Sequence, residues 1–128
     1  MGWSVTYSGE AAAQLEEAKE KALANPNGAH AAYYESVVKI VKEVIANPDL
    51  SISPQNMLKS SLAGVLRVKV GKRYRVFYLA SSTRGRAIVL LFGYRKNGDK
   101  NDAYRVFERL LHRGVFDAYF TELGVGKP

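Results

Sequence analysis

Apolar residues recur at helical spacing in the first third of the chain. Residues 3–7 alternate between polar and apolar and predict a short strand. Ser8 is placed to cap a helix that starts near Glu10, and the turn residues 25–28 end that helix. The apolar stripe of the helix is expected to be Ala11, Leu15, Ala18 and Ala22.

A second helix is predicted to end at Asn47, because a proline disfavours helical geometry in the residue before it. Its inner face is expected to carry Tyr34, Val37, Val38, Val41, Val44 and Ile45. Residues 49–60 predict a loop. Segments rich in Val, Tyr, Phe and Leu, separated by glycine-containing turns, then predict an antiparallel meander of three strands at residues 64–70, 73–81 and 86–94.

Two more helices are predicted after the meander. A polar loop, residues 95–101, leads to a helix that begins near Asp102 and ends at Gly114, and a short amphipathic helix follows it. Their apolar residues are Ala103, Phe107, Leu110 and Leu111, then Phe116, Tyr119, Phe120 and Leu123. This order predicts an α+β fold over residues 1–128 as one domain, with an N-terminal strand, two helices, an antiparallel meander and a C-terminal helix. The helices are expected to pack on one face of the sheet.

Composition excludes several classes of site. The chain has no cysteine, so a disulfide framework, a thiol nucleophile and a thiolate metal site are excluded. His30 and His112 are far apart in sequence, and neither a P-loop nor a dinucleotide fingerprint is found, so no metal or cofactor is expected. No apolar run reaches the ~18 residues of a membrane span and the N-terminus is not a secretory signal, so we expect a cytoplasmic protein.

Charge is distributed unevenly along the chain. Residues 1–58 carry four Lys and Arg against seven Asp and Glu, whereas residues 59–128 carry fifteen against five. The second part therefore holds all of the net positive charge, which favours a polyanionic partner. A generally basic, solvated surface is the alternative.

Strand periodicity sorts these charges onto one face. Side chains two positions apart share a face, so Leu66, Val68 and Val70 are expected on one side and the basic residues on the other. Residues 64–94 contain no Asp or Glu that would relieve repulsion between neighbouring cations. A phosphate backbone would neutralise such a row, whereas an ordinary solvated face is the alternative. The expected open row is Arg67, Lys69, Arg73 and Arg75.

The loop and helix after the meander add further candidates. An aromatic residue beside a basic groove is a common means of holding unstacked bases, and Tyr104 in the first turn of the helix fits this role. Tyr94 shares the strand parity of Ile88, Leu90 and Phe92 and is expected to face with them. The loop also carries Arg95, and the candidate RNA-binding cations in this region are Lys96, Lys100 and Arg105.

Several motifs resemble known toxins. The segments RVKV, RYRVFY and FGYRK, followed by a helix that bears Tyr104, resemble the RelE/ParE superfamily. Gly2-Trp3, the segment KVGKRYRVFY and the block at residues 100–114 more closely resemble the YhaV toxin family, over nearly the whole chain. The resemblance implies a RelE-like fold and a metal-independent, ribosome-dependent mRNA endonuclease of a type II toxin–antitoxin system. It also implies inhibition by a cognate antitoxin similar to the PrlF, AbrB-type DNA-binding proteins.

The resemblance also implies roles for individual residues. The basic pair of RelE-type toxins corresponds to Arg67 and Lys69, the arginine of the second strand to Arg75, the arginine after the third strand to Arg95, and the C-terminal tyrosine to Tyr104. Cleavage would proceed by attack of a ribose 2′-hydroxyl on the adjacent phosphate. Lys69 is the candidate base, since neighbouring cations disfavour the charged form of a lysine. Arg75 would stabilise the phosphorane and Arg95 the leaving oxygen, and Tyr104 would orient a base or donate a proton.

Two other functions are compatible with the sequence. A ParE-like gyrase inhibitor would use the same fold, but it does not need a dense set of basic residues on the meander. A non-enzymatic RNA-binding or ribosome-binding module would use the basic face without cutting RNA. The sequence favours the endonuclease.

Overall fold

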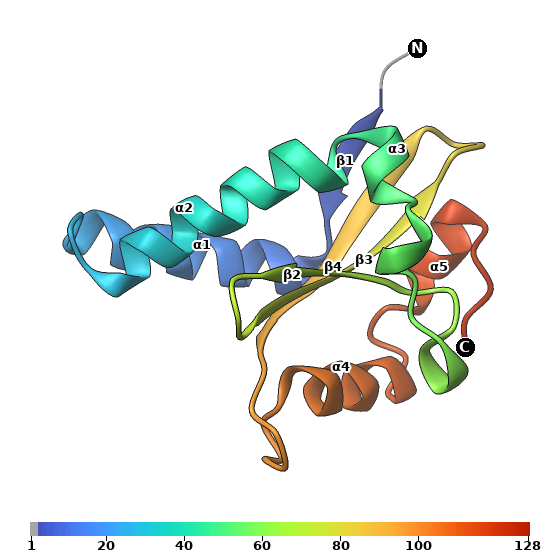
Figure 1. Ribbon diagram of the computed structural model, residues 1–128. Coiled ribbons are helices and arrows are strands. Elements are labelled where there is room, and N and C mark those ends of the chain that lie inside the picture. Colours follow the sequence, from blue (N-terminus) through green and yellow to red (C-terminus); the bar gives the residue numbers. More distant parts are fainter. Residues whose placement is uncertain (1–2) are drawn as a thin grey trace.

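The computed structural model describes residues 3–128 (Figure 1). Gly2, which belongs to one of the motifs above, lies outside the described residues. Among the described residues, four strands form one sheet in the order β1-β4-β3-β2. The outer strand β1 is parallel to β4, and the other two pairs are antiparallel. The predicted α+β class and meander are confirmed, with bounds β1 (Ser4–Tyr7), β2 (Leu66–Val70), β3 (Tyr74–Ser81) and β4 (Arg86–Tyr94).

Helices cover both faces of the sheet (Figure 1). On one face lie α1 (Gly9–Ala24) and α2 (Ala29–Ile40), which continues into a π-helical turn, η1 (Val41–Ile45). On the other face lie α4 (Ala103–His112) and α5 (Asp117–Leu123). The prediction that helices pack on one face only is therefore wrong. Both faces of β3 and β4 carry apolar side chains, and helices pack on each face to bury them.

Shorter helical segments connect these layers. The predicted loop at residues 49–60 contains most of them, because Pro48 and Pro54 each start a helical turn rather than an extended chain. They are α3 (Pro48–Ser51) and the 3-10 turns η2 (Pro54–Asn56) and η3 (Ser60–Leu62). None of the helices in residues 3–128 is both long and apolar enough to cross a membrane.

Polar side chains attach α1 to the sheet. The Ser8 hydroxyl accepts a hydrogen bond from the Ala11 N–H at 3.0 Å, which confirms the predicted helix cap, and donates to the Leu90 carbonyl at 2.6 Å. The Gln14 amide pairs with both backbone groups of Phe92, at 2.8 and 2.9 Å. The pairing of β1 with β4 ends at Val89. These side chains therefore supply hydrogen bonds to the backbone of β4 beyond that point.

Two apolar clusters lie on the two sides of the sheet. In the cluster under α4 and α5, the Phe77 ring stacks on Phe107 at 4.4 Å between centroids, and Phe107 stacks on Phe116 at 5.3 Å. These three rings are fully buried. Rings of this size supply much of the apolar area that a core buries, so this stack fixes α4 beneath β3. The first turn of α4 thereby comes to lie beside the basic residues of β2.

A β-bulge in β4 reverses the alternation on which one prediction depended. Phe77 pairs with Leu91 and Tyr78 with Val89, so Leu90 is the extra residue. Ile88 and Leu90 belong to the cluster under α4, whereas Phe92 belongs to the cluster under α1 and α2. The expectation that Tyr94 faces with Ile88 and Leu90 is therefore wrong. Tyr94 lies opposite Tyr74, on the side of α2.

Candidate active site

Three of the predicted basic residues share one face of β2 and β3. Lys69 lies directly opposite Arg75, and Arg67 lies opposite Phe77, whose ring faces α4. Residues opposite each other in an antiparallel pair have Cβ atoms roughly 4.5–5.5 Å apart. The predicted alternation of β2 is confirmed. The face is not open as expected, because α4 covers part of it: Lys69 is exposed, Arg67 is half-buried and Arg75 is only 8% exposed.

Arg75 has a specific local setting. Its Nη1 donates to the carbonyl oxygens of Lys72 at 3.1 Å and Tyr74 at 3.0 Å, which hold the guanidinium against the β2–β3 turn. Its buried Nε has no hydrogen-bond partner within residues 3–128, and the same is true of the Nε of Arg67. A buried donor without a partner costs about 1–3 kcal/mol. The fold thus leaves two guanidinium donors unsatisfied on the same face of the sheet.

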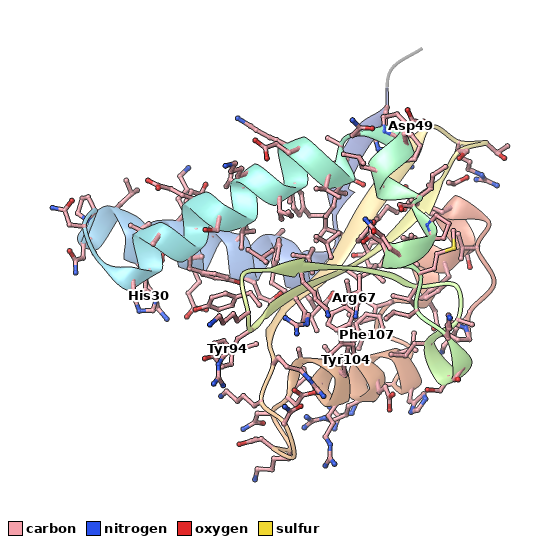
Figure 2. The ribbon with its side chains drawn as sticks, viewed as in Figure 1. His30, Asp49, Arg67, Tyr94, Tyr104 and Phe107 are labelled. Carbon is pink, nitrogen blue, oxygen red and sulfur yellow. The ribbon has the colours of Figure 1, made fainter. Side chains whose placement is uncertain are left out.

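Tyr104 joins this face to α4 (Figure 2). Its hydroxyl accepts a hydrogen bond from Arg67 Nη1 at 2.9 Å, and its ring packs edge-on against Phe77 at 5.3 Å between centroids. The Arg95 guanidinium lies over the same ring, 4.9 Å from its centroid, at a distance suited to a cation–π interaction. Arg67 of β2 and Arg95, which directly follows β4, thus meet at one tyrosine.

Asp102 organises the far side of the site. It caps α4 by accepting from the Tyr104 N–H at 3.1 Å, and it also accepts from Lys96 N–H at 2.6 Å and pairs with Arg95 at 2.5 Å. Burial raises the pKa of this carboxyl. The backbone hydrogen bonds and the Arg95 charge outweigh that effect, so the pKa lies below its ordinary value. Asp102 is therefore a buried carboxylate that positions both Arg95 and Tyr104.

The remaining predicted RNA-binding residues lie around this centre. Arg73 lies in the β2–β3 turn, because β3 begins only at Tyr74, so the prediction that it lies in one row with Arg67, Lys69 and Arg75 is wrong. Its guanidinium lies 6.0 Å from the Tyr94 ring centroid. Lys96 lies 5.8 Å from the same centroid. Lys100 and Arg105 are exposed on the loop and on α4.

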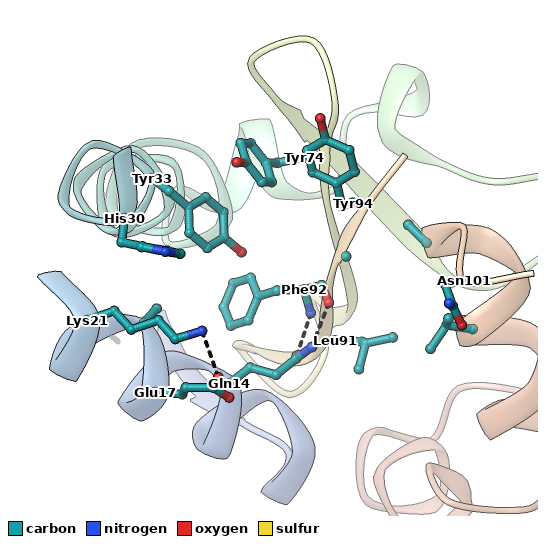
Figure 3. Close-up of a pocket in the computed structure, with 14 residues that line it drawn as sticks. Gln14, Glu17, Lys21, His30, Tyr33, Tyr74, Leu91, Phe92, Tyr94 and Asn101 are labelled. Atoms are coloured by element: carbon teal, nitrogen blue, oxygen red, sulfur yellow. Dashed lines mark hydrogen bonds and ion pairs between the residues drawn. The ribbon is translucent and has the colours of Figure 1, made fainter. Parts of the chain in front are cut away.

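Two parts of the site did not emerge from the sequence as functional residues. Asp102 was expected only as the start of a helix, although an acidic cap next to a basic loop is a usable signal. Tyr33 and Tyr74 were not singled out. They line a groove of about 410 Å³ that runs between α1, α2 and α4 and also contains His30 (Figure 3). The other histidine, His112, lies exposed at the end of α4.

The charge balance of the site favours an anion. None of the ion pairs formed between residues 3–128 includes Arg67, Lys69 or Arg75, and Arg95 is the only one of the four that pairs with a carboxylate in this part of the chain. Neighbouring like charges are unfavourable until an anion neutralises them. Among the same residues, no cluster of three or more His, Asp or Glu side chains could hold a metal ion. Chemically, the site offers guanidinium donors, an amine and a phenol.

The chain was compared with known proteins. A search of curated proteins found no match. A protein-family model, described as a toxin with endonuclease activity of a toxin–antitoxin system, matches residues 6–125 and so covers all but the two ends of the chain. This protein therefore belongs to the YhaV family, the endonuclease toxins of toxin–antitoxin systems.

Proposed function

We propose that the nucleic acid cut by this toxin is messenger RNA, and that the cut is made at the face formed by Arg67, Lys69, Arg75, Arg95 and Tyr104. The observation that carries the proposal is the pair of half-buried and buried arginines, each with an unpartnered Nε, beside an exposed lysine and a phenol hydroxyl. Guanidinium groups suit phosphate because they offer two parallel donors.

The proposed reaction is an in-line displacement at phosphorus. The ribose 2′-oxygen attacks the adjacent phosphate, its proton passes to a base, and the bond from phosphorus to the 5′-oxygen breaks. The leaving oxygen takes up a proton, so the products are a 2′,3′-cyclic phosphate and a 5′-hydroxyl. This reaction requires a base, stabilisation of a dianionic phosphorane and neutralisation of the leaving oxygen.

The geometry supports distinct roles for the residues. Lys69 is exposed and lies opposite Arg75, where its amine can accept the proton of the 2′-hydroxyl. Arg75 is held rigidly by two carbonyl groups, so it can stabilise the phosphorane without reorganising. Arg95 is fixed by Asp102 and would stabilise the leaving oxygen, since an arginine gives up a proton reluctantly. The Tyr104 hydroxyl, which accepts a hydrogen bond from Arg67, is the candidate acid.

Partners extend the proposal. Membership of a toxin–antitoxin family makes a cognate antitoxin a partner of this chain. We propose an AbrB-type antitoxin similar to PrlF, and mRNA bound on the ribosome as the target, as the sequence resemblance implies. Co-expression with a small AbrB-like protein should neutralise toxicity and yield a stable complex. If toxicity persists and no complex forms, an AbrB-type antitoxin is excluded.

Product chemistry tests the proposal. Purified protein and translating ribosomes should give RNA fragments that end in a 2′,3′-cyclic phosphate, and a 2′-deoxy nucleotide at the cleaved position should block the cut. Addition of EDTA after ribosomes have been stabilised by polyamines should leave the rate unchanged. Arg75→Ala should lose activity. Arg113→Ala should retain it, because it removes an equal charge at the C-terminal end of α4, whereas the candidate site lies at the N-terminal end of this helix. Fragments with a 3′-hydroxyl, or cleavage by Arg75→Ala at the wild-type rate, would overturn the proposed mechanism.

A further inference from the structure

Three tyrosines form a continuous aromatic cluster at the end of the sheet (Figure 3). Tyr74 precedes Arg75 in β3, so the cluster and Arg75 lie on opposite faces of the sheet. The rings of Tyr33 on α2 and Tyr74 on β3 lie 4.2 Å apart between centroids, and Tyr94 at the end of β4 meets Tyr74 edge-on at 5.1 Å. Burial and the neighbouring Tyr74 raise the pKa of Tyr33 to about 12, so its phenol stays neutral. The three rings therefore form one contiguous aromatic surface that joins α2 to β3 and β4.

Tyr94 is open to solvent and flanked by cations. It is 36% exposed, although tyrosine rings in a purely structural cluster are usually covered. The side chains of Arg73 and Lys96 approach its ring at 6.0 and 5.8 Å. Neither cation forms an ion pair with any residue in 3–128. An exposed aromatic between two such cations fits a base with its phosphates better than an apolar protein segment.

The surrounding surface is hollowed on both sides of the cluster. Grooves of about 410 and 380 Å³ are both lined by Tyr33, Tyr74 and Tyr94. Pockets of roughly 300–1,000 Å³ accommodate small organic ligands, a range that includes a nucleotide. The larger groove also offers polar groups from Asn101 and His30 that can meet the edge of a base.

The cluster is continuous with the candidate active site. Arg95 directly follows Tyr94 in the chain, and its N–H donates to the carbonyl of Arg73, which binds the two segments together. Arg75 lies opposite Gly93, the residue before Tyr94. A strand of RNA that passes around this end of the sheet would meet the cleavage face on one side and the tyrosines on the other.

We propose that Tyr94, supported by Tyr74 and Tyr33, is a stacking platform for an unpaired base that flanks the cleaved phosphate, with Arg73 and Lys96 holding the adjacent phosphates. This inference deepens the proposed function and rests on it for the identity of the ligand as RNA. An antitoxin segment in the same groove is the alternative that the experiment must detect.

The test uses a short single-stranded RNA with 2-aminopurine at one position and 2′-O-methyl groups throughout, so that it cannot be cleaved by 2′-hydroxyl attack. Binding to the full-length protein should quench the fluorescence at one label position, because stacking quenches this base. Tyr94→Ala should remove the quench and weaken binding by about five- to a hundredfold. Tyr94→Phe should restore both, since it keeps the ring.

The matched control is Tyr34→Ala, which removes a tyrosine of α2 that lines a different surface, beside Val38. It should leave the quench and the affinity unchanged. A normal quench with Tyr94→Ala would overturn the platform, as would no binding of this RNA by the wild-type protein. The platform would also fall if Tyr94→Ala lost antitoxin binding while RNA affinity was kept. A normal quench by wild-type protein that leaves mRNA on translating ribosomes uncut would support the platform and overturn only the cleavage function.

Discussion

Replacement of Asp102 perturbs the site without touching the RNA. Its carboxylate is almost fully buried and accepts hydrogen bonds from the Lys96 N–H, the Tyr104 N–H and Arg95. Asp102→Ala removes all of them and leaves the first turn of α4 uncapped. We therefore expect both a less stable fold and a misplaced Arg95 and Tyr104.

The magnitude follows from the contacts that are lost. The missing helix cap costs about 0.5–2 kcal/mol. Breaking a fully buried ion pair costs about 3–5 kcal/mol. The Arg95 side chain is 36% exposed, so solvent screens the Arg95–Asp102 pair, and its loss should cost about 1–2 kcal/mol. The expected total is about 1.5–4 kcal/mol. For a chain of this size each kcal/mol lowers the melting temperature by about 4 °C, so a decrease of about 6–16 °C is expected.

Asp102→Asn distinguishes the contribution of the α4 helix cap from that of the ion pair with Arg95. An asparagine can still accept from the Tyr104 N–H, so about half of the loss should be recovered. The pH dependence gives a second readout. Because the pKa of Asp102 is below its unfolded value, its stabilising effect is complete above about pH 4 and is lost as the pH falls through the folded-state pKa. Wild-type protein should therefore lose stability below about pH 4 more steeply than Asp102→Asn.

Circular dichroism melts at pH 7 and between pH 2.5 and 5 would measure these effects, with cleavage assayed on the same samples. A melting temperature of Asp102→Ala within 2 °C of wild type would refute the structural role. Wild-type cleavage rates from a destabilised Asp102→Ala would show that Arg95 and Tyr104 need no positioning.

Three further predictions concern neighbouring positions. Gly93→Ala would place a Cβ 2.6 Å from the Cβ of Ala103, so β4 and α4 must separate, with a loss of about 1–3 kcal/mol in denaturant titrations and slower cleavage; an unchanged midpoint would contradict the close approach of β4 to α4. Tyr104→Phe keeps the ring but loses the hydroxyl bonded to Arg67, and the cleavage rate should fall about 10²-fold with little change in melting temperature. Lys69→Arg keeps the charge but not a usable base, so RNA should still bind and cleavage should stop; near-normal turnover would remove Lys69 as the base.

The strand pattern predicted the basic face because alternation is a local property. Spacing puts Arg67 and Lys69 on one face of their strand, and the expected pairing with the next strand adds Arg75; the pairing of β2 with β3 has that arrangement. The same reasoning failed where the regular strand was interrupted. Arg73 lies in a turn, and the extra residue Leu90 reverses the faces beyond it.

Contacts between distant segments could not be read from local patterns. The packing of α4 against the basic face depends on Phe107 stacking on Phe77, thirty positions away in sequence. The pairing of Arg95 with Asp102 depends on how the intervening loop folds back. The tyrosine cluster joins α2 to two strands, and neither helix nor strand periodicity connects such positions.

The most direct test of the central claim is the mapping of new RNA ends in cells. Primer extension of a translated transcript should reveal discrete 5′ ends within minutes of inducing the wild-type protein. Arg75→Ala, produced at the same level and shown to be folded, should give none, and Arg113→Ala should give the wild-type pattern. Discrete ends with Arg75→Ala, or growth arrest by the wild-type protein with no new ends, would contradict cleavage of mRNA at this face.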